Sequence, residues 1–337
     1  MENGKRIAVI GAGSFGMALA RLLALKGNAV TVYTRSGDNA RLLSETRENR
    51  DKLPGVVLPE SVRFTASMEE ACRDSDVYLA VVPSVSFRQT LRQMEPYTGG
   101  AKDTAPVVIS ATKGIEQESL KLMTDLIAEE LPFVNAAALS GPTHAEEVGK
   151  DMPTAIVAGA ETEETAAFVQ DLFMTPTFRV YTSTDLTGIE TGGALKNVIA
   201  LAAGIADGMG YGDNAKAAMI TRGVYEMTRL GVAMGGRAET YAGLSGIGDL
   251  IVTCASMHSR NRRAGILIGQ GKSCEEACRE VKMVVEGVNS ARAAAALSEK
   301  YGIEMPIVAS VNRVLFEGLS PREAVEALML RDRKAET

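Results

Sequence analysis

The sequence has no tryptophan, only two histidines and only four cysteines among its 337 residues. With His144 and His258 as the only imidazoles, a histidine-rich metal site is excluded. The cysteines include no Cys-x-x-Cys pair. Cys274 and Cys278 stand four residues apart, on one face of an expected helix. This spacing fits either a zinc site or two ordinary thiols on a helix, and we expect no metal.

Long apolar runs and an excess of positive charge are also absent. The apolar run at 198–206 spans nine residues, well short of the ~20 that cross a bilayer, and the N-terminal apolar stretch is too short for a signal peptide. The net charge of −6 argues against a general nucleic-acid binder. The net charge is still compatible with binding of a small anionic ligand, provided that basic side chains cluster locally. The sequence therefore predicts a cytoplasmic protein with reduced thiols.

The length is typical of about two domains, at roughly 150 residues each. The first half alternates short β-branched runs with helical patterns, which predicts a parallel, doubly wound α/β sheet. We expect strands at 5–10, 29–33, 76–82, 107–111, 135–139, 154–160 and 178–182, and helices at 15–26, 117–131 and 162–173. From about residue 185, apolar residues recur only at helical spacing. We therefore predict a Rossmann-type domain at 1–187 and an all-helical domain at 188–337.

A glycine-rich turn follows the first expected strand. The segment Gly11-Ala12-Gly13-Ser14-Phe15-Gly16 leaves that strand and opens a helix. In this context the glycines let the backbone approach a pyrophosphate, and the N–H groups of the helix N-terminus face the phosphates. The alternative is a glycine turn that serves packing alone. The segment predicts a dinucleotide site in residues 1–187.

The second strand ends in Thr34-Arg35 rather than in an acidic residue. An acid at that place would bind a free ribose 2′-hydroxyl, whereas an arginine suits a 2′-phosphate. This favours NADPH, with NADH also allowed. The alternative for Arg35 is a solvated surface cation.

Two polar segments directly follow later strands. One is 110–116, which contains Lys113, and the other is 140–147, which contains Gly141, Thr143 and Ala145. Doubly wound folds bind ligands at this carboxyl edge of the sheet, where Lys113 could meet an anion. Each segment can equally be a capped loop.

The helical pattern at 190–203 is so rich in small apolar residues that it predicts a buried helix, yet it carries Lys196 and Asn197. Burial lowers the pKa of a lysine, which suits a group that gives a proton to the alkoxide formed when a carbonyl is reduced. A lysine that reaches water at the rim is the alternative. Neither histidine is better placed.

A local cation cluster follows at 259–263. Ser259-Arg260-Asn261 offers a hydroxyl, a guanidinium and an amide in succession, which suits a phosphate. Arginines at an exposed helix start are the alternative. Upstream, Asp249 could orient Lys196 or hold a substrate hydroxyl.

The ordered set of motifs resembles the bacterial NAD(P)-dependent sn-glycerol-3-phosphate dehydrogenases over nearly the whole chain. The motifs are 11–16, 113–116, 140–148, 193–197 and 259–261. The resemblance implies a Rossmann-type domain, a helical domain of the 6-phosphogluconate dehydrogenase type and an active site between them. It further implies reversible reduction of dihydroxyacetone phosphate to sn-glycerol 3-phosphate for phospholipid synthesis.

The resemblance also implies residue roles. The cofactor would contact Gly11, Gly13, Ser14, Phe15, Gly16, Arg35, Lys113, Ala145, Arg260, Val284 and Glu286. The substrate would contact Lys113, Gly141, Thr143, Lys196, Asp249, Ser259, Arg260 and Asn261, with Lys196 as proton donor or acceptor. His144 is expected to be a packing residue.

Two alternative functions stay open: another phospho- or hydroxyacid dehydrogenase of this architecture, and a non-enzymatic dinucleotide sensor. The expected partner is a small molecule, and a homodimer is the one protein partner considered.

Overall fold

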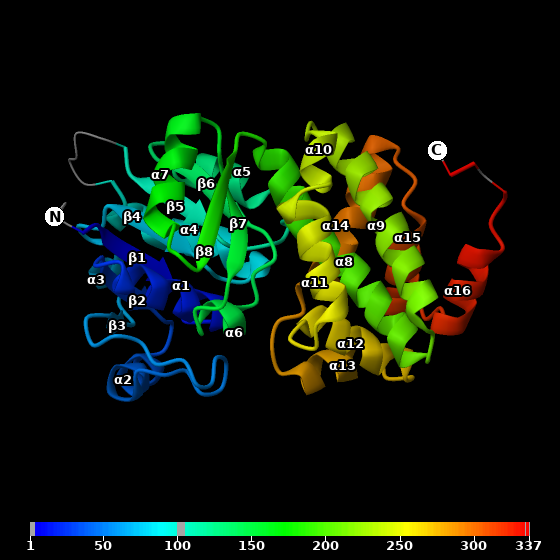
Figure 1. Cartoon of the computed structure of the whole chain (residues 1–337), viewed down its shortest axis with the longest axis horizontal. Helices are drawn as coiled ribbons and strands as arrows, with labels where there is room; N and C mark the ends of the chain where they lie inside the picture. Colours follow the sequence, from blue (N-terminus) through cyan, green and yellow to red (C-terminus); the bar gives the residue numbers. More distant parts are fainter. Residues whose placement is uncertain (1–3, 100–104, 334, 337) are drawn as a thin grey trace. The chain divides into compact units, whose positions relative to one another are not determined.

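The computed structural model describes residues 4–99, 105–333 and 335–336, and the chain divides into two compact units (Figure 1). Unit 1 comprises Met1–Glu116 and Lys121–Glu190, and unit 2 comprises Gln117–Leu120 and Thr191–Thr337. The division at residue 190 falls inside helix α8 (Leu186–Gly208).

Unit 1 is built on one eight-stranded sheet of order β3-β2-β1-β4-β5-β6-β7-β8. The strands are β1 (Arg6–Ile10), β2 (Ala29–Tyr33), β3 (Arg63–Thr65), β4 (Val77–Ala80), β5 (Val107–Ser110), β6 (Asn135–Ser140), β7 (Thr154–Ala160) and β8 (Phe178–Ser183). The helices are α1 (Ser14–Leu25), α2 (Gly37–Thr46), α3 (Met68–Cys72), α4 (Phe87–Met94), α5 (Met123–Glu130), α6 (Ala145–Val148) and α7 (Glu163–Phe173), with short 3-10 turns η1 (Ser84–Ser86) and η2 (Glu95–Tyr97).

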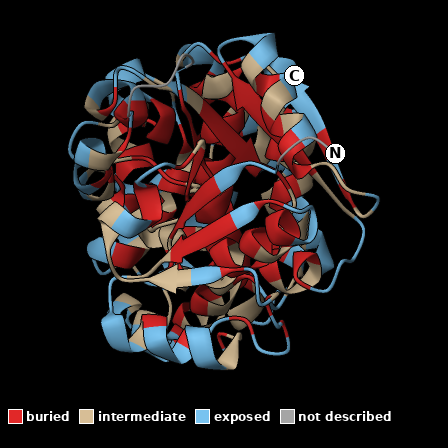
Figure 2. Cartoon of the chain, turned by 90° about the vertical axis from the view of Figure 1, so that its left-hand side faces the viewer, coloured by how far each residue is buried: buried red, intermediate tan, exposed pale blue. Residues whose placement is uncertain are grey.

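Alternating side chains of the central strand enter two different cores. Ile7 and Val9 of β1 pack in one cluster with residues of α1 and α7. Ala8 and Ile10 pack in the other with residues of α3, α4 and α5. The strands are therefore buried on both faces, as Figure 2 shows for most of the sheet.

The predicted doubly wound sheet is confirmed, but one pairing differs from the expected parallel pattern. Strand β7 runs antiparallel to β6, while all other pairs in the sheet are parallel. The connection between them holds only the four-residue helix α6. A helix of four residues rises about 6 Å, which is too short to carry the chain back along the sheet.

Two local predictions were also wrong. The helix expected at 117–131 begins only at Met123, because Leu120 adopts a left-handed backbone with φ of 61° and Ile115 bridges to Leu122. The short strand β3 was missed, since its three residues give no clear alternation.

In unit 2 the described residues form helices and no strand, which confirms the predicted helical half. After α8 come α9 (Asp213–Ala233), α10 (Ala238–Tyr241), η3 (Leu244–Gly248), α11 (Asp249–Ala255), α12 (Arg260–Gly269), α13 (Cys274–Val281), α14 (Glu286–Tyr301), α15 (Pro306–Phe316) and α16 (Pro321–Met329). The turn η3 is a π-helix, a rare form that is frequent at functional sites.

Glycines bring α8 and α12 into backbone contact. A Cβ added to Gly204 would lie 2.2 Å from the carbonyl oxygen of Arg262, and one added to Gly265 would lie 2.2 Å from that of Leu201. No side chain fits at either position, so the two helices approach more closely than ordinary side chains allow. This contact fixes the start of α12 against the middle of α8.

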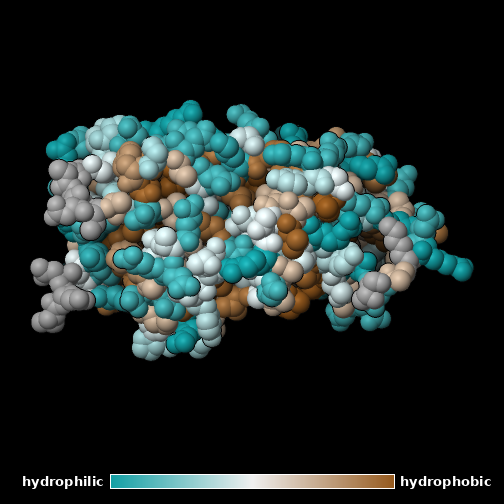
Figure 3. Space-filling view, turned by 90° about the horizontal axis from the view of Figure 1, so that it is seen from above, coloured by the Kyte–Doolittle hydropathy of each residue, from teal (hydrophilic) through white to brown (hydrophobic). Residues whose placement is uncertain are grey.

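One face of the molecule is mostly polar. On the face drawn in Figure 3, hydrophilic residues predominate and hydrophobic ones form small patches. Within the described ranges, no helix combines the length and hydropathy needed to cross a membrane.

Candidate functional site

The glycine loop of unit 1 has the shape that a dinucleotide needs. Gly11 follows β1 with φ of 124°, and a Cβ there would lie 2.4 Å from the carbonyl oxygen of Val81. A Cβ on Gly16 would lie 2.0 Å from the carbonyl oxygen of Gly11. By contrast, a Cβ on Gly13 would meet nothing within 4 Å. The chain's own packing therefore requires Gly11 and Gly16, and the space beside Gly13 is available to a ligand.

The start of α1 can accept phosphate oxygens. Its N-cap is Gly13, which provides no side-chain cap, and its first turn contains no acidic residue. The Ser14 hydroxyl donates to the carbonyl oxygen of Lys52 at 2.7 Å, and the buried Asn49 amide donates to that of Ala12 at 2.9 Å. These two hydrogen bonds hold the loop in place, and Phe15 packs against the hydrophobic core of unit 1. These features fit the pyrophosphate of a dinucleotide.

Arg35 lies at the carboxyl end of β2, directly before the Ser36 cap of α2. Its side chain is exposed, and β2 is the neighbour of β1 in the sheet. A guanidinium in this place can reach a ribose 2′-phosphate, although an exposed arginine is also common without a ligand.

Lys113 joins two of the predicted segments of unit 1. Its Nζ donates to the carbonyl oxygen of Gly141 at 2.6 Å and to Thr143 Oγ1 at 3.4 Å. Gly141 has φ of 151° and follows β6, while Ala145 is the buried first residue of α6. The loops after β5 and β6, which are neighbouring parallel strands, therefore meet at the carboxyl edge as predicted.

In unit 2, Lys196 is buried in a polar cluster. Only 6% of Lys196 and 1% of Asp249 are exposed. Lys196 Nζ donates to Asp249 Oδ1 at 3.0 Å and to Thr253 Oγ1 at 2.7 Å. The structure thus supports the buried lysine rather than one at the rim, and Asp249 orients it. An ammonium inside the protein needs such a partner because desolvation is costly.

Thr253 is a site residue that sequence reasoning did not assign. Its hydroxyl contacts Lys196 and also donates to the backbone carbonyl oxygen of Asp249 at 2.6 Å. The signal was available, since Asp249 and Thr253 stand four residues apart and so share one face of α11.

A second polar cluster links three helices. Asn261 Nδ2 donates to Asn197 Oδ1 at 2.8 Å, and Asn261 Oδ1 accepts from the Gly287 N–H at 2.8 Å. A Cβ on Gly287 would lie 2.6 Å from the carbonyl oxygen of Asn197. The Asn261 side chain therefore ties α8, α12 and α14 together, which its predicted role in substrate binding did not foresee.

The remaining predicted residues of unit 2 lie at the starts of α12 and α14. Ser259 caps the helix, because its hydroxyl accepts from the Arg262 N–H at 3.1 Å. Arg260 is the half-buried first residue of α12. Val284 is exposed, and Glu286 begins α14.

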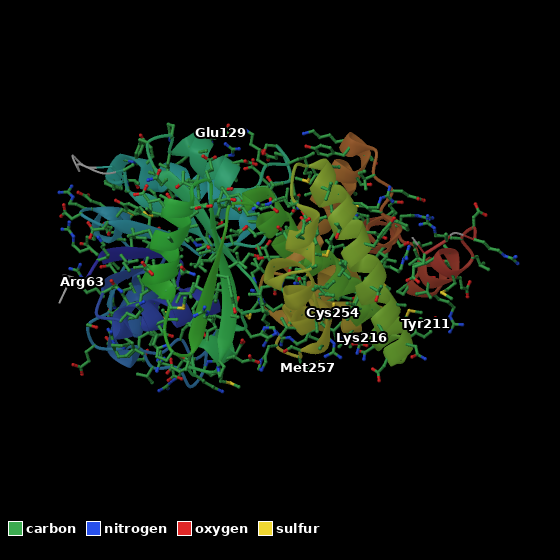
Figure 4. All side chains as sticks on the ribbon, turned by 45° about the horizontal axis from the view of Figure 1, so that its top comes forward. Arg63, Glu129, Tyr211, Lys216, Cys254 and Met257 are labelled. Carbon is green, nitrogen blue, oxygen red and sulfur yellow. The ribbon has the colours of Figure 1, made fainter. Side chains whose placement is uncertain are left out.

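Arg262 belongs to a different contact. Its Nε donates to Asp207 Oδ2 at 2.8 Å, and Lys216, which is labelled in Figure 4, pairs with Asp207 Oδ1 at 2.9 Å. Of the arginines predicted to form a cluster, Arg262 is thus bound to Asp207.

The four cysteines are free thiols. Among the described residues no group of three or more His, Cys, Asp or Glu side chains is arranged to hold a metal. Burial raises the pKa of Cys254 to about 12, and burial together with the Cys278 thiol raises that of Cys274 to about 11. Of the two readings of the Cys274–Cys278 pair, the ordinary helical thiols fit better.

A cavity of about 760 Å³ lies elsewhere in unit 2, between α14, α15 and the end of α16. Its lining includes Glu304, Pro306 and Arg331 and none of the predicted site residues. This cavity is therefore separate from the polar clusters described above.

Comparisons with known proteins identify relatives of this chain. Residues 6–166 match the family described as NAD-dependent glycerol-3-phosphate dehydrogenase N-terminus, and residues 185–326 match its C-terminus. A glycerol-3-phosphate dehydrogenase (NAD(P)+) of Agathobacter rectalis is 54% identical over 331 residues, which are 98% of this chain and 97% of that protein. The Bacillus subtilis enzyme of the same name is 48% identical over 335 residues, covering 98% and 96%. The crystal structure of glycerol-3-phosphate dehydrogenase from Coxiella burnetii has a TM-score of 0.93 at 36% identity, covering 97% and 99%.

Proposed function

The chain belongs to the NAD-dependent glycerol-3-phosphate dehydrogenases, and from this membership we propose that it catalyses the reversible reduction of dihydroxyacetone phosphate to sn-glycerol 3-phosphate. The cofactor is NADPH, with NADH accepted less well. The product is the phosphorylated glycerol backbone from which phospholipids are made. The observation that carries the proposal is the buried Lys196 with its partners Asp249 and Thr253.

Unit 1 holds the nucleotide in this proposal. The glycine loop and the N-terminus of α1 bind the pyrophosphate, and Arg35 binds the 2′-phosphate of NADPH. Ser14, Phe15, Lys113 and Ala145 complete the set in this unit. Arg260, Val284 and Glu286 keep the cofactor role that the family resemblance gives them.

Unit 2 supplies the proton donor and the residues that bind the substrate phosphate. When bound, the reduced nicotinamide supplies the hydride. Lys196 Nζ gives a proton to the oxygen of the developing alkoxide, and in the reverse direction it takes that proton back. Asp249 stabilises the charged ammonium before the transfer and, with Thr253, fixes its position.

The substrate phosphate binds at the start of α12. Arg260 supplies a guanidinium there, and Ser259 and Asn261 shape the turn through their own hydrogen bonds. Asn261, whose amide bonds to Asn197 and to Gly287, lies in the first turn of α12, where backbone N–H groups can donate to a phosphate. Lys113, Gly141 and Thr143 keep their predicted substrate role.

A substrate screen separates this function from its alternatives. Purified protein with NADPH should oxidise the cofactor rapidly with dihydroxyacetone phosphate and at least 100-fold more slowly with dihydroxyacetone, because Arg260 has no phosphate to hold. Comparable rates with unphosphorylated 2-keto acids would indicate another dehydrogenase of this architecture. Cofactor binding with no turnover of any carbonyl compound would indicate a dinucleotide sensor.

We extend the proposal to a cytoplasmic location and to a homodimer. The four free cysteines, two of them fully buried, fit a reducing compartment. Cell fractionation tests the location, and sedimentation velocity of the purified protein tests the dimer.

A further inference from the structure

The segment that carries Lys113 is fastened at its far end by an arginine with no role in the proposed chemistry. This segment leaves β5 after Ser110 and ends at Glu116, the last residue of unit 1 before the chain enters unit 2. Arg88 on α4 donates to both oxygens of Glu116, from Nε to Oε1 at 2.7 Å and from Nη2 to Oε2 at 2.8 Å. This is the two-pronged geometry in which a guanidinium binds a carboxylate best.

The cluster around Arg88 is compact and partly shielded from solvent. Arg88 also contacts Glu130 and, at 3.2 Å, Glu129, which is labelled on α5 in Figure 4. The side chains of Arg88, Glu116 and Glu130 are 19%, 15% and 13% exposed. The hydrogen bonds that Arg88 donates to Glu116, Glu129 and Glu130 hold its pKa above its ordinary value. Such a pair is restrained more strongly than an exposed ion pair.

The near end of the same segment is fastened as well. The Ala111 N–H donates to the carbonyl oxygen of Ala80 at 2.9 Å, and Thr112 Oγ1 donates to that of Val82 at 2.7 Å. Ile115 is buried and bridges to Leu122. Lys113 therefore lies on a short segment that is held at both ends. The contact between Arg88 and Glu116 is at the end where the chain leaves unit 1.

We propose that Arg88 is a positioning residue for binding of the phosphorylated substrate. Its hydrogen bonds to Glu116 fix the backbone of the segment from which the Lys113 side chain reaches its ligand. The inference rests on the proposed function, in which Lys113 contacts the substrate. A lysine side chain is long and flexible, so the site gains precision only if the backbone below it is fixed.

Arg92 provides a matched control on the same helix. It lies four residues after Arg88 and donates to Glu130 from Nε at 2.9 Å and from Nη2 at 3.0 Å. Its side chain is 64% exposed, and its bonds go to α5 rather than to the Lys113 segment. Replacing either arginine removes one charge and contacts to Glu130, but only the Arg88 variant loses the two hydrogen bonds to the Glu116 carboxylate.

The test compares Arg88→Gln, Glu116→Gln and Arg92→Gln in steady-state assays with dihydroxyacetone phosphate and NADPH. We expect Arg88→Gln and Glu116→Gln to raise the KM for the phosphate substrate by about tenfold with a smaller change in kcat, since a small misplacement of a binding group is costly. Arg92→Gln should change KM less than about twofold. Thermal unfolding confirms that each variant is folded, and Glu116→Gln breaks the same contact if Arg88→Gln does not fold.

A double-mutant cycle with Lys113→Ala distinguishes positioning from a general loss of stability. If Arg88 acts through Lys113, Arg88→Gln adds almost nothing to the KM of Lys113→Ala. Independent, multiplying effects would overturn the inference, as would equal KM values for Arg88→Gln and Arg92→Gln. A wild-type enzyme without turnover, or a Lys113→Ala variant with unchanged KM, would instead overturn the proposed role of Lys113 and this inference with it.

Discussion

In unit 1 the residues assigned to ligand binding lie in loops after strands or at the helix starts that follow them, whereas in unit 2 Lys196, Asp249 and Asn261 lie within helices and bond to other polar side chains. Gly13 borders open space and Arg35 is exposed, while Lys196, Asp249, and Asn261 are buried with their polar groups engaged. A loop at a sheet edge offers backbone N–H groups to a ligand at little cost to the fold. A buried cluster contributes to stability and to chemistry through the same contacts. Substitutions in unit 1 should therefore affect binding, and those in unit 2 both turnover and folding.

The largest effect is expected at Lys196. Lys196→Met should lower kcat by roughly 10²–10⁴-fold, because the alkoxide loses its proton donor. It should also cost about 3–5 kcal/mol of stability, since Asp249 stays buried without its cation. Stopped-flow and steady-state kinetics measure the first effect and denaturant unfolding the second.

Lys216→Met is the matched control for loss of a lysine from unit 2. Its partner Asp207 keeps Arg262 as a counter-ion, so both kcat and stability should change little. Retention of most of the wild-type kcat by Lys196→Met would contradict the assigned role of this residue.

The glycine loop tests whether unit 1 separates binding from stability. Gly16→Ala places a methyl group against the carbonyl oxygen of Gly11 and should cost about 1–3 kcal/mol or more. Gly13→Ala enters open space with an ordinary φ of −76°, so it should leave the melting temperature almost unchanged. It should nevertheless weaken NADPH binding by about tenfold, because the methyl group occupies the place of the pyrophosphate. Calorimetric titration decides, and undiminished NADPH affinity in Gly13→Ala would place the phosphates elsewhere.

In each unit a buried glutamate accepts hydrogen bonds at the N-terminus of a neighbouring helix. Glu190 accepts from the N–H of Thr124 at 3.2 Å and from its hydroxyl, and Glu226 accepts from the N–H of Ile307 at 2.8 Å. Burial raises the pKa of Glu190 to about 8 and that of Glu226 to about 7. Both values lie above the roughly 4.3 of an unfolded chain, so the folded state binds more protons between these limits. The stability from each group is full below about pH 4.3 and falls as the pH rises to the folded pKa.

Denaturant unfolding from pH 5 to pH 8 measures this dependence. Each group should contribute a slope of about −1.4 kcal/mol per pH unit, ending near pH 7 for Glu226 and near pH 8 for Glu190. Glu190→Gln and Glu226→Gln should each flatten the profile over their own window. Glu45→Gln, at an exposed position of α2, is the control. Identical profiles for all three variants would show that neither buried carboxyl titrates in this range.

The smallest effect is expected at Arg35, the most exposed of the ligand contacts proposed in unit 1. Arg35→Glu should weaken NADPH by about tenfold and leave NADH nearly unaffected, because only NADPH carries the 2′-phosphate. Arg41→Glu, which changes the same charge on exposed α2, should alter neither affinity beyond about twofold. Equal losses of NADPH and NADH in Arg35→Glu would mean that the side chain does not contact the 2′-phosphate.

Much of the fold could be predicted from the sequence because its signals are local. The strand before Gly11, the helix after it and the helical second half follow from apolar periodicity and glycine placement. The antiparallel β7 could not be predicted, since it depends on how far a connection reaches across a sheet. The late start of α5 has the same kind of cause, because residues 117–120 pack in unit 2 rather than continue a helix.

The sequence by itself predicted which residues would carry the chemistry: a glycine loop after a strand, and a lysine in a helix too apolar to be exposed. Tertiary structure decided what these residues touch. Gly204 and Gly265 let two helix backbones meet, so Asn197 bonds to Asn261, sixty-four positions away. Arg88 reaches Glu116 because α4 and the loop after β5 lie together. Spacing along a chain reports neighbours within one helix or strand, and contacts between elements depend on the close packing of the whole unit.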